Sequence, residues 1–206
     1  RSSILRSSLP RFWSITTCSL LSSAILAVAC DRRPGFKSTD ITGAEYGKTL
    51  DLTDHTGRPR TLQDFRGKAV VVFFGFTHCP DVCPTTLADV SQAIRQLGPD
   101  TQRVQVLFVT VDPERDTKEV LAKYVAAFDP AFLGLYGDAA ATQRAAKEFK
   151  VYYEKRKTAD GYSVDHSAQS YIIDPQGRLR LFVRHDRIRT DLPDDLRVLL
   201  KEGAPD

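Results

Sequence analysis

Two cysteines and one histidine carry the chemistry that this sequence suggests. Cys79 and Cys83 are four residues apart and follow the apolar run V-V-V-F-F-G, while His166 stands shortly before the segment Y-I-I-D-P-Q-G. Two thiolates and one imidazole are donors that suit a soft metal ion of low coordination number such as Cu(I). The same two thiols can also close into a disulfide, so metal binding and oxidation would exclude one another.

The apolar pattern predicts the elements that position the cysteines. Ala69–Gly75 is a continuous apolar run with β-branched residues, which predicts a buried central strand. Apolar residues recur at helical spacing within residues 84–97, which predicts an amphipathic helix. The pair therefore lies where a strand gives way to a helix, and the unpaired N–H groups of a helix start lower the pKa of a nearby thiol. A separation of four residues also places both sulfurs on one face if that segment is helical.

Strands and helices alternate along the rest of the chain. This order is typical of an α/β sandwich around a central mixed sheet, and the cysteines at the end of its first long strand predict a thioredoxin-like fold. An N-terminal hairpin is expected across D-H-T-G and a late hairpin across D-P-Q-G. The same patterns predict the remaining elements. Strands are expected over residues 50–53, 60–62, 104–111, 132–136, 151–155 (followed by a polar loop through 161), 170–173 and 179–183, and helices over 117–128, 139–149 and 193–201.

The first 29 residues are interpreted as a targeting segment. Three arginines precede an apolar stretch without charge, which ends A-V-A-C at Cys30. This pattern is typical of a secretory signal, and the cysteine indicates a lipoprotein signal with a lipid on Cys30, although Ala27 stands where such signals usually carry leucine. An apolar stretch of about 18 residues also suffices for an uncleaved anchor helix. We therefore expect a signal or anchor over residues 1–29, a tether over 30–47 whose last part can lie against the domain, and a folded domain over 48–206.

Composition and charge agree with an ordinary exported domain. The chain has 206 residues, 42% of them hydrophobic and 27% charged. The first 29 residues hold three of the 29 basic residues and none of the 26 acidic ones, so the body is formally neutral and gives no argument for nucleic acid. One close cysteine pair in the body is not the pattern of a disulfide-stapled scaffold.

Three motifs resemble those of the Sco/SenC family. They are T-H-C-P-D-V-C-P (77–84), V-D-P-E-R-D-T (111–117) and V-D-H-S-A-Q-S-Y-I-I-D-P (164–175), and the upstream D-I-T-G-A-E-Y-G is familiar from bacterial members. The resemblance covers roughly residue 36 to the C-terminus. It implies a thioredoxin-like, membrane-anchored protein that binds copper through Cys79, Cys83 and His166 and faces the periplasm. It also implies a role in assembling the binuclear copper site of cytochrome c oxidase subunit II, with a periplasmic copper donor as a second partner.

Three functions remain open from the residues. The first is a copper metallochaperone, which is a transfer protein and not an enzyme. The second is a thiol–disulfide oxidoreductase in which Cys79 and Cys83 form a redox-active pair and reduce the partner's cysteines. Three residues separate the pair, and no proline occurs between residues 131 and 174 where thioredoxin-like reductases carry a cis-proline, so a general thioredoxin is disfavoured. The third, a thiol peroxidase, lacks the threonine or serine expected three residues before the reactive cysteine.

Several other polar residues are weaker candidates. Structural zinc usually takes four ligands, and only His78 or Asp81 stands close enough in sequence to supply a fourth. Asp112 is expected either to shape the pocket or to form a salt bridge that closes its loop, and Asp165 to fix the loop that bears His166. The remaining expectations concern surface residues: a basic strand face over residues 178–189, either solvated or a docking surface for an acidic partner, and solvated side chains for His55 and His185.

Overall fold

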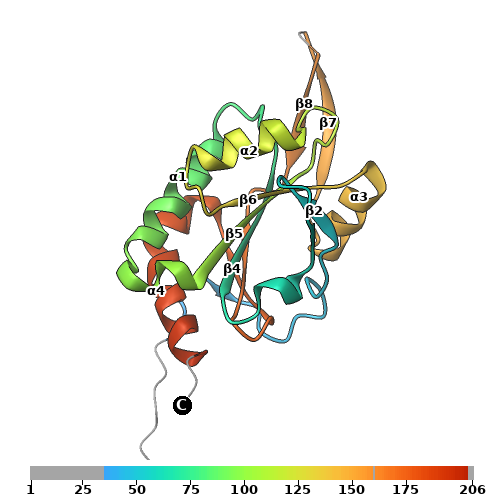
Figure 1. Cartoon of the computed structure of the whole chain (residues 1–206). Helices are drawn as coiled ribbons and strands as arrows, with labels where there is room; N and C mark the ends of the chain where they lie inside the picture. Colours follow the sequence, from blue (N-terminus) through green and yellow to red (C-terminus); the bar gives the residue numbers. More distant parts are fainter. Residues whose placement is uncertain (1–34, 160, 204–206) are drawn as a thin grey trace, which may run out of the picture. The chain divides into compact units, whose positions relative to one another are not determined.

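The computed structural model describes residues 35–159 and 161–203 of the chain (Figure 1). The predicted signal or anchor over residues 1–29, and Cys30 with its expected lipid, lie outside these residues. Among the residues that are described, no helix has both the length and the apolar character needed to cross a bilayer.

One eight-stranded mixed sheet organises the domain. Its order is β1-β10-β9-β4-β5-β6-β2-β3, with β4, β5 and β6 parallel and β9 antiparallel to β4. Every residue of β4 is buried, because helices cover the sheet and leave its central strands no solvent-facing side. The bounds are β1 Thr39–Asp40, β2 Leu52–Asp54, β3 Pro59–Arg60, β4 Ala69–Gly75, β5 Val104–Thr110, β6 Leu133–Tyr136, β9 Ser170–Ile173 and β10 Leu179–Val183. The central mixed sheet and both predicted hairpins, β2–β3 and β9–β10, are confirmed.

Four α-helices pack on this sheet. Figure 1 shows α1 (Val82–Arg95) and α4 (Ile188–Glu202) side by side along one side of the sheet, and α3 (Ala139–Glu148) on the other. The helix α2 (Lys118–Ala126) contacts β6. Asp138 caps α3 by accepting the N–H of Ala141 at 2.6 Å, which satisfies one of the free N–H groups of the first turn.

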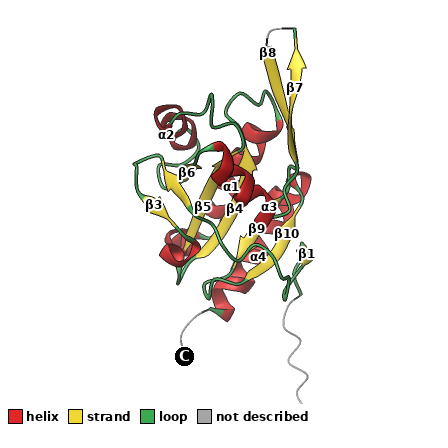
Figure 2. Cartoon of the chain, turned by 90° about the vertical axis from the view of Figure 1, so that its right-hand side faces the viewer, coloured by secondary structure: helices red, strands yellow, loops and turns green. Residues whose placement is uncertain are grey.

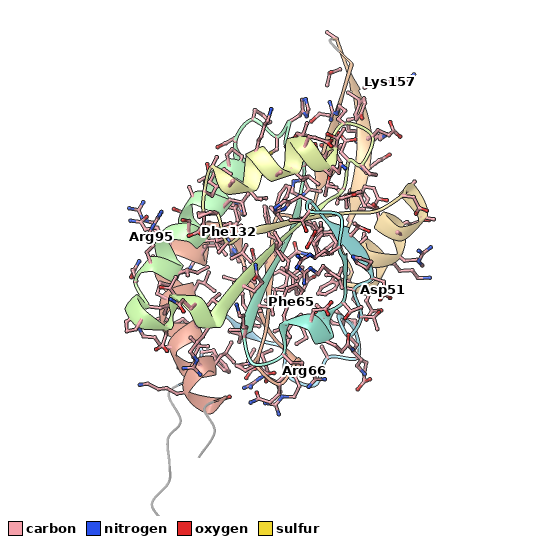
Figure 3. The ribbon with its side chains drawn as sticks, viewed as in Figure 1. Asp51, Phe65, Arg66, Arg95, Phe132 and Lys157 are labelled. Atoms are coloured by element: carbon pink, nitrogen blue, oxygen red, sulfur yellow. The ribbon has the colours of Figure 1, made fainter. Side chains whose placement is uncertain are left out.

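Aromatic side chains fill the core between these layers. Phe73 on β4 lies beside Phe108 on β5, with ring centroids 6.1 Å apart. The ring of Phe149, after α3, contacts both Phe74 and Tyr171, each with centroids 5.5 Å apart. Neighbouring side chains before β4 point in different directions. Figure 3 shows that Phe65, which is buried, turns toward the sheet, whereas Arg66, which is exposed, extends outward.

A two-stranded hairpin projects from the end of the domain. Figures 1 and 2 show β7 (Tyr153–Thr158) and β8 (Gly161–His166) as a ribbon that stands apart from the main sheet. The strand predicted over 151–155 is found as β7, but it continues to Thr158, so residues 156–158 of the predicted polar loop are strand. A second strand that was not predicted, β8, completes a ladder in which Tyr153 pairs with His166 and Thr158 with Gly161. His166 therefore ends a strand of its own and does not lie in a loop before β9.

Three further segments differ from the predictions. The C-terminal helix begins at Ile188, so Pro193 lies inside it instead of starting it. The strand expected over 60–62 is β3, Pro59–Arg60, and a 3₁₀ helix over Leu62–Phe65 follows it. Within the segment expected as a tether, β1 pairs with β10, and the N–H groups of Lys37 and Ser38 donate to the Asp195 carboxylate. Two more 3₁₀ helices, Gly98–Arg103 and His185–Arg187, precede β5 and α4.

Candidate metal centre

The two cysteines sit at the junction of β4 and α1. Cys83 belongs to the first turn of α1 and is fully buried, whereas Cys79 lies in the preceding loop and is half-buried. Gly75, the last residue of β4, leaves the room for this arrangement. A Cβ at position 75 would lie 2.8 Å from Cys83 Sγ, which is closer than two such atoms can approach. A glycine at the end of β4 therefore allows the sulfur of Cys83 to pack against the strand.

His166 reaches this junction from the base of the β7–β8 hairpin. Its Nε2 lies 3.3 Å from Cys83 Sγ, and its Nδ1 lies 2.9 Å from the carbonyl oxygen of Ser167. An N–H on Nδ1 can donate to that carbonyl, which leaves the lone pair of Nε2 facing the sulfur. The rings of Phe73 and Phe76 meet the imidazole edge-on, with centroids 6.3 Å and 5.8 Å away.

The three predicted site residues form one cluster of donor atoms. The sulfurs of Cys79 and Cys83 and a ring nitrogen of His166 all lie within 4.8 Å of one another. Both cysteines are free thiols. In the part of the chain that the structure describes, this is the only group of three or more His, Cys, Asp or Glu side chains arranged to hold a metal ion.

The pKa values of the two thiols shift in opposite directions because the thiols share one hydrogen bond. The hydrogen bond with Cys83 lowers the pKa of Cys79 to about 3 although burial opposes this. The same hydrogen bond, together with burial, raises the pKa of Cys83. The pair therefore holds one negative charge and one proton at neutral pH. A monovalent soft cation can take the place of that proton.

A buried carboxylate anchors the segment in front of Cys79. Asp116 accepts the N–H of Thr77 at 3.0 Å, the hydroxyl of Thr77 at 2.6 Å and the hydroxyl of Thr110 at 2.6 Å. It is 1% exposed, so these donors replace the water that its charge would otherwise need. Sequence reasoning assigned Asp116 no role, although it belongs to a cluster of charged residues over 112–116. The signal that could have found it is a buried strand, β5, that ends directly before the cluster.

The weaker candidates lie outside the cluster of donor atoms. His78 is exposed, with Nδ1 3.8 Å from the Asp116 carboxylate, and Asp81 is exposed at the start of α1. Asp112 forms the predicted salt bridge, because its carboxylate accepts from Arg115 Nε at 2.5 Å. Asp165 accepts from Arg156 Nε at 3.0 Å across the hairpin, and its role in fixing the segment with His166 stays a prediction.

The arginines of the basic segment 178–189 are exposed as expected, except Arg180, and the prediction for His55 was also wrong. Arg180, expected on an exposed basic face, is 8% exposed, and its Nη1 lies 3.1 Å from Asp174 and 2.9 Å from Glu202. The acids that neutralise it come from a turn and from α4, which the local pattern could not reveal. His55, expected to be solvated, is partly buried and accepts the N–H of Gly134 on Nδ1 at 3.1 Å. His185 is exposed as expected.

Comparisons with known proteins agree with this geometry. The sequence profile of the SCO1/SenC family matches residues 38–201. The mitochondrial SCO2 homolog of Bos taurus is 42% identical over 152 residues, and that of Homo sapiens 41% over 150 residues. These matches cover 72% and 71% of this chain but 57% and 56% of the relatives, so the chain spans a little over half their length.

Solved structures extend the match to the fold. Bradyrhizobium japonicum ScoI with copper bound is 39% identical with a TM-score of 0.69, over 76% of this chain and 99% of that one. Apo Sco1 from Thermus thermophilus is 40% identical with a TM-score of 0.70, over 80% and 95%. Yeast Sco1 with copper bound is 31% identical with a TM-score of 0.70, over 79% and 92%. The thioredoxin-like fold is thus confirmed, and the chain belongs to the SCO1/SenC family.

Proposed function

We propose that the domain binds one copper ion as cargo through Cys79 Sγ, Cys83 Sγ and His166 Nε2, and delivers it to the binuclear copper site of cytochrome c oxidase subunit II. The observation that carries the proposal is the convergence of these three donor atoms within 4.8 Å. Solved relatives at 39% and 31% identity hold copper, which supports the choice of metal.

The donor set favours Cu(I) over zinc. Two thiolates and one neutral imidazole suit a soft ion of low coordination number. Structural zinc takes four ligands as a rule, and within residues 35–159 and 161–203 no fourth His, Cys, Asp or Glu joins the cluster. A three-coordinate ion also keeps one side open to an incoming ligand.

Loading exchanges the shared proton for the metal. Cys79 is already a thiolate at neutral pH, and its charge attracts the cation. Cys83 must lose its proton when its sulfur binds copper, so loading releases about one proton per ion. His166 binds as a neutral ring because Ser167 fixes the hydrogen on Nδ1, and copper therefore gains a third donor without a further charge.

Transfer proceeds by ligand exchange from the accessible side of the site. Cys79 is the half-buried thiol and Cys83 the fully buried one, so a thiolate of the partner meets the copper from the side of Cys79. His166 can leave as a neutral ring. We further propose that the chain works attached to the membrane and faces the periplasm, held by a lipid on Cys30 or by an N-terminal helix, and receives copper from a periplasmic donor.

A thiol–disulfide reductase is the second candidate, and the state of the thiols favours it. Thiolate Cys79 would attack a partner disulfide and form a mixed disulfide, and Cys83 would then attack Cys79 and release the partner as a dithiol. Two electrons pass to the partner, and this chain keeps a Cys79–Cys83 disulfide. His166 has no part in that exchange, which separates the two functions experimentally.

The two functions are tested with one variant and two assays. His166→Ala is expected to weaken Cu(I) binding, measured by competition with a chromogenic chelator, more than about 100-fold, since losing an outer-shell partner alone costs about 10–100-fold. The same variant should reduce, at the wild-type rate, a disulfide peptide that carries the cysteines of the oxidase copper site. Wild-type Cu(I) affinity in His166→Ala would refute the three-ligand site.

A further inference from the structure

The hairpin that carries His166 depends on contacts outside its own ladder. Among the side chains of β7 and β8, which leave out residue 160, only Val164 is buried, and β7 is exposed along nearly its whole length. Figure 3 shows Lys157 near the far end of the ribbon, away from the sheet. An isolated two-stranded hairpin is marginally stable in water. The position of His166 relative to the sulfurs therefore depends on what holds the hairpin to the domain.

Tyr162 holds the hairpin on the face that carries His166. Successive side chains of a strand alternate between its two faces, so Tyr162 and His166, four residues apart on β8, share one face with Val164. The hydroxyl of Tyr162 donates to Asp112 Oδ1 at 2.8 Å. Arg115 Nη1 donates to the carbonyl oxygen of Tyr162 at 2.9 Å.

Two cations also lie over the ring of Tyr162. Arg115 Cζ is 3.8 Å from the ring centroid, and Lys155 Nζ, on the partner strand β7, is 4.8 Å away. Lys155 in turn pairs with Glu114 at 2.6 Å. The hairpin is thus joined to the loop of residues 112–116 through hydrogen bonds, cation–π contacts and an ion pair.

The same loop holds the cysteine segment on its other side. Asp116 accepts both the N–H and the hydroxyl of Thr77, two residues before Cys79. Within the loop, Arg115 pairs with Asp112, and the Asp112 N–H donates to Thr110 Oγ1 at 2.9 Å. One short loop therefore contacts both the segment with the cysteines and the hairpin with the histidine.

We propose that Tyr162, with Asp112 and Arg115, is a latch that positions His166 against the two sulfurs. The inference rests on the proposed copper site. Closing the latch brings Nε2 to the thiols, and opening it withdraws the imidazole while Cys79 and Cys83 keep their places on the strand–helix junction. Tyr162 is a positioning residue, since its contacts are with Asp112, Arg115 and Lys155 and it acts through His166.

Two variants of the full chain test the latch through Cu(I) affinity, measured by chelator competition. Tyr162→Phe removes only the hydroxyl, and Tyr162→Ala removes the ring as well. If the closed hairpin becomes a minor state, the apparent Cu(I) affinity is reduced in proportion to the fraction of molecules that remain closed. Tyr162→Ala is expected to weaken Cu(I) binding about 10–100-fold, as for other outer-shell partners, and Tyr162→Phe by a smaller factor.

A matched control separates the latch from general loss of the hairpin. Tyr152 precedes β7, is exposed, and directs its hydroxyl to Glu154 instead of the 112–116 loop. Tyr152→Phe is therefore expected to bind Cu(I) as the wild type does. The decisive measurement is a double-mutant cycle. Tyr162→Ala should add almost no further loss in a His166→Ala background, because a latch acts only through the imidazole.

The outcomes distinguish failure of the latch from failure of the site. Wild-type affinity in Tyr162→Ala, or the same loss with and without His166, would overturn the latch while leaving the copper site intact. No effect of His166→Ala by itself would overturn the copper site on which the latch rests.

Discussion

Replacing Gly75 with alanine is expected to displace the sulfur of Cys83. The added Cβ would lie 2.8 Å from Cys83 Sγ and 2.8 Å from Phe108 Cε2, whereas nonbonded carbon atoms attract best at about 3.5–4.0 Å. One neighbour must then move by roughly 0.7 Å. Overpacking of this kind costs about 1–3 kcal/mol, and a domain of this size loses about 2–4 °C in Tm per kcal/mol. If about 1.4 kcal/mol of that strain falls on the metal-bound arrangement, the Cu(I) Kd rises about tenfold.

The assay compares two buried glycines. Gly134→Ala, on β6, is the control, because its Cβ would lie 3.0 Å from Leu121 Cβ and outside the site. Thermal unfolding followed by circular dichroism gives the loss of stability, and chelator competition gives the Cu(I) Kd. Both variants should lower Tm, and only Gly75→Ala should weaken Cu(I) binding. Equal Cu(I) affinity in the two variants would show that the contact of Gly75 with Cys83 does not place the sulfur.

Two more expectations concern the thiols and the buried ion pairs. Iodoacetamide should modify Cys79 before Cys83. The rate at Cys79 should be nearly constant from pH 5 to pH 8, because its lowered pKa keeps it a thiolate throughout this range. Mass spectrometry that found Cys83 labelled first would contradict this order. Arg180→Met should lower the free energy of unfolding by about 3 kcal/mol in urea titrations, because it leaves Asp174 buried with one partner fewer. Arg184→Met, at an exposed pair, should change it by less than about 1 kcal/mol, and equal effects would refute the role of burial.

The local part of the site could be predicted from the sequence. The apolar run of β4 and the helical spacing that follows place Cys79 and Cys83 at a strand–helix junction, since both signals lie within about 30 neighbouring residues. The contact between His166 and Cys83 joins two residues that are 83 positions apart in the sequence. No local pattern encodes that contact, and only the resemblance to a family supplied it.

The continuation of β7 beyond residue 155 and the whole of β8 escaped prediction for a physical reason. The residues from Glu154 to Thr158 are all polar and exposed, so β7 shows no alternation of apolar and polar positions. The strand exists because β8 pairs with it and because Tyr162 is held by the 112–116 loop. The opposite error occurred at Arg180. The alternation of basic and apolar residues predicted an exposed side chain, but Arg180 is buried and Asp174 and Glu202 neutralise its charge.

X-ray absorption of the full chain loaded with one equivalent of Cu(I) under reducing conditions tests the central claim most directly. The spectrum reports the atoms bound to the metal. The proposed site predicts two sulfur neighbours and one imidazole nitrogen in the wild type, and loss of the nitrogen with retention of both sulfurs in His166→Ala. A copper ion with no nitrogen neighbour, or a spectrum unchanged by His166→Ala, would contradict it.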